Sequence, residues 1–142
     1  MKQKYNNWQK FHHDRLKSEY PEWPNELMLR LIFGNFLKDR IKIKKKINVL
    51  DVGCGFGNNL LAFSKFNAGL YGTEVTNHIC QLTSNILKKK NIDSTIKLGF
   101  NKKIPFKNNF FDLLLSINVL HYENNEADIK KALIEYRRVL KK

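Results

Sequence analysis

Residues 49–58 read Val49-Leu50-Asp51-Val52-Gly53-Cys54-Gly55-Phe56-Gly57-Asn58. This pattern is typical of a buried strand that breaks into a glycine-rich turn and then a helix. Glycines at alternate positions let the backbone adopt positive φ and approach a ligand to contact distance, which a Cβ would prevent. The first amides of the following helix point at the same place, because they have no partner within the helix. The stretch therefore predicts an α/β fold that holds a nucleotide-type cofactor at this turn.

The spacing of the glycines separates two classes of cofactor. A dinucleotide-binding fingerprint has the pattern G-x-G-x-x-G, whereas these glycines fall at 53, 55 and 57 and Asn58 stands where the third glycine would belong. Asp51 lies two residues before the turn, and a carboxylate there suits a cationic group better than a phosphate. An NAD-dependent enzyme is therefore the least favoured interpretation.

This pattern resembles the first motif of class I S-adenosylmethionine-dependent methyltransferases. The resemblance implies a Rossmann-like three-layer α/β/α domain with a mostly parallel sheet, and S-adenosyl-L-methionine as the cofactor. It also implies that the glycine turn approaches the amino-acid moiety of the cofactor, and that Asp51 helps to orient the turn and the cofactor's ammonium group. The cofactor contacts expected from this motif are Asp51, Gly53, Cys54, Gly55, Gly57 and Asn58.

A second match follows a short strand predicted over Ala68 to Gly72. A carboxylate at the tip of this strand can accept hydrogen bonds from both ribose hydroxyls, because it has two oxygens and no proton. The family has an Asp or Glu here, followed by an apolar residue and a small hydroxyl residue, and Glu74-Val75-Thr76 fits this order. The resemblance therefore adds Glu74 and Val75 to the expected cofactor contacts. Taken alone, Glu74 would be a solvated loop acid.

A third match covers a loop and the fourth strand. Gly99 to Phe106 resembles the family's G-D-x-x-x-L-P-F loop, and the run that starts at Phe111-Asp112 resembles its fourth strand. The family's Asp, which contacts the adenine amino group, is replaced by Phe100. Adenine recognition is then expected from backbone groups, from Asn101 or from stacking on Phe100, and Ser116 at the end of the strand is also expected to face the cofactor. The alternative interpretation of the strand, glycine-rich turn and helix that start at Val49 is a bare structural turn in an α/β domain.

The carboxyl end of the fourth strand, Ser116 to Tyr122, is expected to face the same crevice as Gly53 and Glu74. Methyl transfer is an in-line displacement, so an enzyme accelerates it mainly by aligning the acceptor with the methyl group and the sulfur. A hydroxyl acceptor must also lose a proton. Histidine is the side chain that most readily accepts a proton near neutral pH, so we predict His121 as the catalytic base. A structural loop histidine is the alternative, and His12 and His13 are rival bases.

The acceptor expected from this strand end is a small molecule. Enzymes that methylate amino groups of DNA or protein glutamine usually carry an N/D-P-P-Y/F motif here, and residues 116–119 do not match it. We therefore expect a sugar or another hydroxylated metabolite as the acceptor.

Helical patterns surround these motifs. An aromatic segment over residues 1–23 is predicted to be helical, and it is either a lid over the site or a helix packed on the outside of the core. Pro21 and Pro24 bracket a turn, and Asn25 is a candidate helix cap. Apolar residues then recur at helical spacing in four further segments: Leu27, Met28, Leu31, Ile32, Phe36 and Leu37; Leu60, Leu61, Phe63 and Phe66; Thr76 to Lys89; and Glu126 to Leu140.

The length of 142 residues predicts a single domain, with an N-terminal helical or lid segment over 1–46 and a cofactor-binding core over 47–142. The predicted elements correspond to the first four βα units of the family, whose sheet continues further, so the chain is expected to be truncated. The fourth strand would then be an edge, with Phe110 to Ile117 unpaired on one side and open to self-association. A non-catalytic remnant or interaction module that needs a partner is therefore a rival hypothesis.

The formal net charge is +13, but 21 of the 26 basic residues are Lys and only five are Arg. Because Arg is the residue favoured for bidentate phosphate and base contacts, an RNA methyltransferase is a secondary hypothesis. Lys44 to Lys46 and Lys88 to Lys90 are explained by a connector and a solvated helix end. Cys54 and Cys80 have no disulfide or metal-binding spacing, which favours the cytoplasm and no metal. Neither a signal peptide nor a membrane span is predicted.

Overall fold

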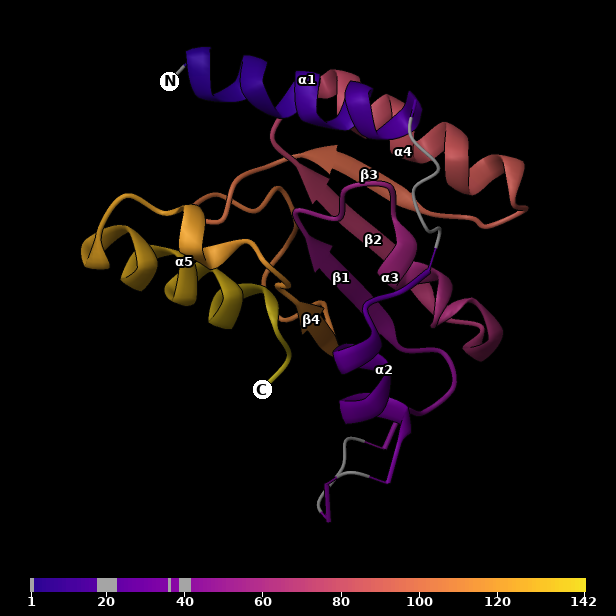
Figure 1. The fold of residues 1–142 in the computed structure, drawn as a ribbon. Coiled ribbons are helices and arrows are strands. Elements are labelled where there is room, and N and C mark those ends of the chain that lie inside the picture. The colour runs from indigo at the N-terminus through magenta and orange to yellow at the C-terminus, as the bar shows by residue number, and fades with distance from the viewer. Residues whose placement is uncertain (1, 18–22, 36, 39–41) are drawn as a thin grey trace.

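The computed structural model of the chain describes residues 2–17, 23–35, 37–38 and 42–142. Its centre is a sheet of four parallel strands in the order β3-β2-β1-β4, and their carboxyl ends meet at one edge (Figure 1). The strands are β1 (Asn48–Val52), β2 (Gly69–Glu74), β3 (Thr95–Leu98) and β4 (Leu113–Leu115). The predicted α/β fold with a parallel sheet is confirmed.

Three of the described helices begin at a capping side chain. Asn25, Thr76 and Asn125 each accept a hydrogen bond from the backbone N–H three residues later, at 3.0, 3.3 and 2.9 Å. These bonds satisfy amides that have no partner inside a helix. The described helices are α1 (Lys2–Lys17), α2 (Glu26–Phe33), α3 (Asn58–Leu61), α4 (Asn77–Lys89) and α5 (Glu126–Val139), with short 3₁₀ turns η1 (Ser64–Phe66) and η2 (Leu120–Tyr122).

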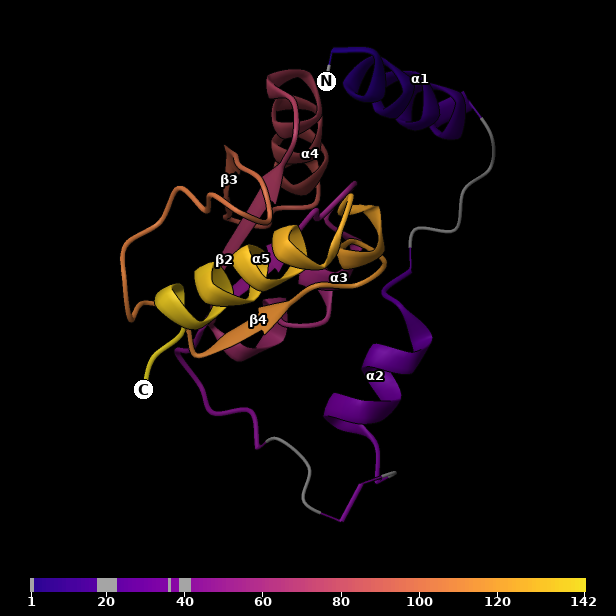
Figure 2. The same cartoon turned by 90° about the vertical axis from the view of Figure 1, so that its left-hand side faces the viewer.

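Successive strand residues face opposite sides of the sheet, so β1, β2 and β4 each contribute to two cores. Val49 packs on one face with α2, α3 and α4, whereas its neighbour Leu50 packs on the other face with α5. Figure 2 shows α5 crossing one face of the sheet, with α3 and α4 behind it. The first core contains Met28, Ile32, Ile47, Val49, Leu60, Phe63, Leu70, Leu87 and Leu115. The second contains Leu50, Val52, Ile104, Phe111, Ala132, Tyr136 and Val139.

Two helical predictions differ from the structure. The pattern over Leu60 to Phe66 forms α3 and the separate turn η1 rather than one helix. The helix expected to reach Leu37 ends at Phe33, because Gly34 is extended there and its N–H closes the last turn on the Arg30 carbonyl at 3.2 Å. Leu37 lies outside any helix and is exposed, and Phe36 lies outside the described residues.

The expected free edge of the sheet is shorter than the sequence predicts. After α5 the chain returns beside the start of β4: Phe110 donates its N–H to the Val139 carbonyl at 2.8 Å, and Lys141 donates to the Phe111 carbonyl at 2.9 Å. The prediction that residues 110 and 111 are unpaired was therefore wrong. In the described part of the chain, Leu113–Leu115 pair with β1 alone.

Candidate functional site

The glycine turn lies between β1 and α3, and its glycines adopt the left-handed conformation that the sequence predicts. Gly53, Gly55 and Gly57 have φ values of 66°, 52° and 79°. At Gly53 a second constraint applies, because a Cβ would stand 2.7 Å from the Cγ2 of Val119, which follows β4. The Gly53 N–H donates to the Thr73 carbonyl at 2.9 Å, so the turn is also attached to β2. Only glycine combines this backbone conformation with this close approach.

Glu74, at the end of β2, holds the turn directly. Its Oε1 accepts the Gly55 N–H at 2.7 Å, and its Oε2 accepts the N–H of Val75 at 3.0 Å. The side chain is buried, with 5% of the residue exposed. The structure thus brings the predicted ribose-binding acid and the glycine turn together. The contact joins residues 19 positions apart in the chain.

Asp51, at the carboxyl end of β1, is 1% exposed and contacts a residue that the sequence analysis missed. Its Oδ2 accepts a hydrogen bond from Asn59 Nδ2 at 3.2 Å, and Asn59 Oδ1 accepts the Asn25 N–H at 3.0 Å. Asn59 therefore connects Asp51 to the start of α2. The Asp51 side chain therefore bonds to α3. The carboxylate that bonds to the backbone of the turn is that of Glu74.

Burial raises the pKa of Asp51 from 3.8 to about 7; the Asn59 hydrogen bond opposes this rise and the nearby Glu74 adds to it. Within the described part of the chain, neither Asp51 nor Glu74 forms an ion pair with a Lys, Arg or His side chain. A buried carboxylate ordinarily has a cationic or hydrogen-bonding partner for each oxygen. The two acids thus form a site that favours a positively charged group.

The other predicted contacts of this half lie close by. Cys54 is buried under the turn, and its Sγ lies so near β2 that a Cβ on Gly72 would stand 2.6 Å away. Burial, together with the charge of Glu74, raises the pKa of the Cys54 thiol, so it remains neutral. Asn58 is the first residue of α3. These placements explain Cys54 as a packing residue of the turn.

The second half of the site is built from the Gly99–Phe106 loop, the end of β4 and α5. Tyr136 Oη donates to Asn101 Oδ1 at 2.9 Å and lies 3.0 Å from Ser116 Oγ. Asn101 Nδ2 in turn donates to Glu123 Oε1 at 2.9 Å. The side chains of Asn101 and Ser116, both predicted as cofactor contacts, are therefore engaged with α5 and the segment after η2. Phe100 lies in a tight turn with Lys103, closed by backbone bonds of 3.1 and 2.9 Å.

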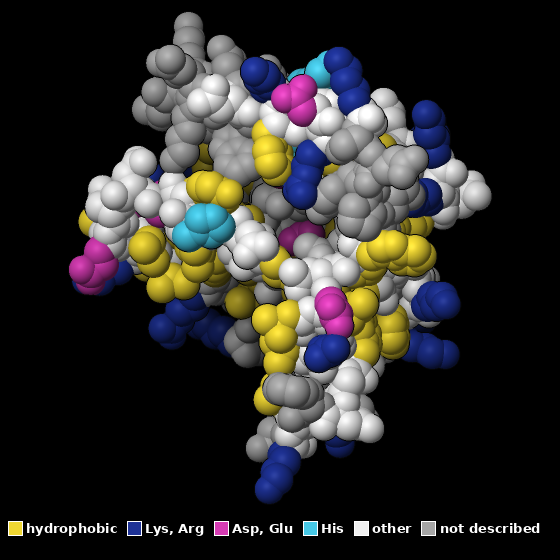
Figure 3. Space-filling view, in the orientation of Figure 1, with side chains coloured by type: hydrophobic (Ala, Val, Ile, Leu, Met, Phe, Trp, Pro, Cys, Tyr) yellow, Lys and Arg dark blue, Asp and Glu magenta, His cyan; other side chains and the backbone are white. Residues whose placement is uncertain are grey.

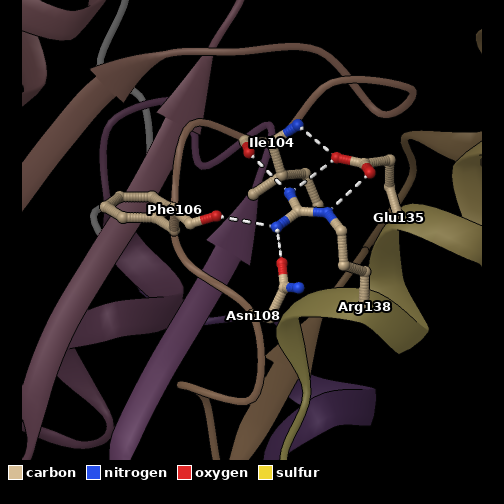
Figure 4. Close-up of polar contacts among 5 residues, drawn as sticks. All are labelled: Ile104, Phe106, Asn108, Glu135 and Arg138. Carbon is tan, nitrogen blue, oxygen red and sulfur yellow. Dashed lines mark hydrogen bonds and ion pairs between the residues drawn. The ribbon is translucent and has the colours of Figure 1, made fainter.

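Arg138 on α5 anchors the far end of the same loop (Figure 4). Its guanidinium donates to the carbonyls of Ile104 at 2.8 Å and Phe106 at 2.9 Å, and to Asn108 Oδ1 at 2.7 Å. Glu135 pairs with Arg138 at 2.7 Å and accepts the Ile104 N–H at 2.9 Å. The hydrogen bonds from Arg138 lower the pKa of the Glu135 carboxyl. The sequence analysis missed this anchor.

The candidate bases lie in different surroundings. His121 is exposed in η2, and the centroid of its ring lies 3.9 Å from that of the Tyr122 ring. His12 on α1 is 8% exposed; its Nε2 lies 3.7 Å from where a Cβ on Gly55 would stand, and its ring meets the Phe56 ring edge-on at 5.3 Å. His13 is exposed. The structure thus places α1 against the glycine turn through His12.

Figure 3 shows a hollow in the middle of one face, with acidic surface at its floor. Lys and Arg side chains are scattered over this face, some of them beside the hollow, and are not gathered in one patch. Among the described residues, no group of three His, Cys, Asp or Glu side chains is placed to hold a metal ion. None of the described helices is both long enough and apolar enough to cross a bilayer.

Residues 49–142, from β1 onward, match the protein family described as "Methyltransferase domain". The chain belongs to this family, the class I S-adenosylmethionine-dependent methyltransferases. The match begins at the strand that carries Asp51 and includes the glycine turn, Glu74, the Gly99–Phe106 loop and α5. The Rossmann-like methyltransferase fold predicted from the motifs is thereby confirmed.

The chain is also similar to individual proteins, some of which are described as methyltransferases. MJ0638 of Methanocaldococcus jannaschii is 33% identical over 133 residues, which are 88% of this chain and 53% of that protein. The uncharacterized methyltransferase YcgJ of Bacillus subtilis is 30% identical over 94 residues, 66% of this chain and 36% of YcgJ. Its crystal structure superimposes with a TM-score of 0.64 at 26% identity, covering 71% of this chain and 42% of that chain.

The sterol 4-C-methyltransferase strm-1 of Caenorhabditis elegans is 26% identical over 107 residues, 74% of this chain and 31% of that protein. The chain thus spans about half of MJ0638 and about a third of YcgJ and strm-1.

Proposed function

We propose that the chain binds S-adenosyl-L-methionine at the glycine turn and transfers its methyl group to a small-molecule acceptor. The observation that carries this proposal is the pair of buried acids, Asp51 and Glu74, beside the left-handed backbone of residues 53–57. Neither acid has a cationic partner in the described part of the chain. S-adenosylmethionine carries an ammonium and a sulfonium group, so its charge complements this half of the site.

The hydrogen-bonding capacity of Glu74 also fits. An ionised carboxylate has about four lone-pair sites, and the backbone N–H groups of Gly55 and Val75 use one on each oxygen. Both oxygens therefore retain capacity for the two ribose hydroxyls. The same contacts hold the carboxylate in place, so binding costs little side-chain entropy. Glu74 is thus organised for the ribose before the cofactor arrives.

In the bound state the cofactor supplies an activated methyl group on sulfur. The work of the chain is then to align the acceptor with that group, and α1 with His12 supports the exclusion of water from the glycine turn. For a hydroxyl acceptor we propose His121 as the base that takes the proton. A small-molecule acceptor is supported by the relative strm-1, a sterol 4-C-methyltransferase, and by residues 116–119, which do not match the N/D-P-P-Y/F motif.

The test is calorimetric titration of the purified chain with the product S-adenosylhomocysteine, and with NAD as the control ligand. We expect binding of S-adenosylhomocysteine alone. Glu74→Ala is expected to weaken it by about 30-fold or more, because hydrogen bonds to a charged group contribute about 1.5–3 kcal/mol each. Glu126→Ala is the matched control, since Glu126 is exposed on α5 and, among the described residues, pairs only with Lys130.

Two outcomes would overturn the cofactor assignment: binding of NAD, or equal affinity of the wild type and Glu74→Ala for S-adenosylhomocysteine. Failure of a folded chain to bind either ligand would instead support the interaction module. Binding without transfer to any tested acceptor would support a domain that has kept its cofactor site and lost its activity.

A further inference from the structure

We infer that Thr83 is a positioning residue for the cofactor-binding turn, which it holds in its binding conformation from α4. The inference rests on the proposed function, because it assumes that the glycine turn binds the cofactor. Thr83 lies outside the three sequence motifs and 28 residues from the turn. It is fully buried, and its Oγ1 donates a hydrogen bond to the Gly55 carbonyl.

The face of α4 that supports the turn is formed by residues one helical turn apart. Thr83 contacts Gly55, and Leu87, four residues later, lies under Gly57, where a Cβ would stand 2.9 Å from Leu87 Cδ1. Side chains at positions i and i+4 lie on the same side of a helix. Both residues are 0% exposed. The helix therefore supports the turn at two of its three glycines, by a hydrogen bond at one and by packing at the other.

At Gly55 the peptide groups on both sides of the Cα are held by side chains. Glu74 Oε1 accepts the N–H at 2.7 Å, and Thr83 Oγ1 donates to the carbonyl. Gly55 has a φ of 52°, a conformation that glycine can leave easily because it has no Cβ to restrict it. The two contacts thus restrain the flexible backbone of Gly55 at the point where Glu74 meets the turn.

Thr83 also lies 2.8 Å from the Ile79 carbonyl, one turn back in its own helix. A hydroxyl has a single proton, so it is shared between the two carbonyls in a three-centre arrangement. Ser84 makes the same bond to the preceding turn, to the Cys80 carbonyl at 2.8 Å, and has no contact with the glycine turn in the described structure. Ser84 therefore provides a control on the same helix for the loss of a hydroxyl.

The experiment compares Thr83→Val, Thr83→Ser and Ser84→Ala by titration with S-adenosylhomocysteine, with folding monitored by circular dichroism and urea unfolding. Thr83→Val keeps the shape and leaves the Gly55 carbonyl without its donor. We expect the affinity to fall by about 5- to 30-fold, the ratio that corresponds to losing one to two hydrogen-bond contributions. Thr83→Ser is expected to restore the wild-type affinity to within about threefold.

Ser84→Ala separates positioning from the loss of a hydroxyl bond within the helix, because it removes the same kind of bond to the preceding turn and is expected to leave the affinity unchanged. Equal affinity of wild type and Thr83→Val, or an equal loss in Ser84→Ala, would overturn the inference while the proposed function stands. If wild type itself does not bind S-adenosylhomocysteine, both fail together. Should Thr83→Val not fold, Thr83→Ala is measured in its place, with the same loss expected.

Discussion

Asp51 and Glu74, beside the glycine turn, contrast with Glu135 and Asp128 on α5, across the sheet. The first pair is buried with hydrogen bonds to amide groups and no cation in the described part of the chain. The second pair is neutralised: Glu135 by Arg138 at 2.7 Å, and Asp128 by Lys102 at 2.7 Å. The pKa values differ accordingly, since burial raises that of Asp51 to about 7, whereas Arg138 lowers that of Glu135.

The difference separates acids that are neutralised within the fold from acids that we propose are neutralised by the cofactor. A paired acid stabilises the fold at neutral pH, because its ionised form is favoured in the folded state. A buried acid without a cation costs stability at neutral pH, and a ligand with the missing charge recovers that cost. The chain has 26 basic residues, and none of those described is placed beside Asp51.

The largest change in stability is expected for a substitution on α5. Arg138→Ala removes the donor for the carbonyls of Ile104 and Phe106, for Asn108 and for the paired Glu135. We expect the free energy of unfolding to fall by about 2–4 kcal/mol, because one partner of a largely buried pair is left behind with unsatisfied carbonyls. Urea denaturation measures the change. Arg137→Ala, at the exposed neighbouring position, is the control, and equal losses in the two variants would contradict the anchoring role.

For Asp51→Asn we expect the free energy of unfolding of the ligand-free chain to rise rather than fall. The folded state keeps the Asp51 proton up to about pH 7, whereas the unfolded chain loses it near its ordinary value of 3.8. The folded state therefore binds more protons in this window, and wild-type stability falls as pH rises from about 4 to about 7. Asparagine has no such proton. Its advantage over wild type is expected to grow by about 2.6 kcal/mol between pH 5 and pH 8.

Urea denaturation of both proteins across this pH range gives the comparison directly. The Asp51→Asn variant is also expected to bind S-adenosylhomocysteine more weakly, because the ammonium group then meets a neutral amide. If the variant is more stable than wild type at pH 8 and binds S-adenosylhomocysteine more weakly, Asp51 lowers the stability of the ligand-free chain and strengthens binding. A pH-independent difference between the two proteins would show that Asp51 is already ionised in the folded chain.

The smallest change in stability is expected at Tyr136, which joins α5 to the Gly99–Phe106 loop. Burial raises the pKa of the Tyr136 hydroxyl, so the hydroxyl stays protonated and donates to Asn101. Tyr136→Phe is expected to lower the free energy of unfolding by about 1 kcal/mol, the usual net contribution of one such bond. Tyr71→Phe is a suitable control, because the Tyr71 ring packs in the same core and its hydroxyl has no hydrogen bond in the described structure. An unchanged urea midpoint in Tyr136→Phe would show that the contact contributes nothing.

The glycine turn, Glu74 and the order of strands and helices were predictable because their causes are local. Positive φ selects glycine at 53, 55 and 57, and apolar residues at periods of two or of three to four identify strands and helices. The boundaries were less predictable. The predicted second strand ends at Gly72, whereas β2 continues to Glu74, because β3 pairs along it as far as Leu98. The fourth strand begins at Leu113 rather than Phe111, because the preceding residues pair with the end of α5.

The amino-acid sequence by itself determined the family, the glycine turn and the presence of an acid at the end of the second strand, since these depend on the conformational freedom and chemistry of single residues. Only the tertiary structure decided the partners: Asn59 for Asp51, Thr83 for Gly55, Tyr136 for Asn101 and Arg138 for the loop. Polar residues on buried helix faces were the available signal. Which carbonyl or amide each one meets depends on how helices distant in the chain dock on the sheet, and no local pattern carries that information.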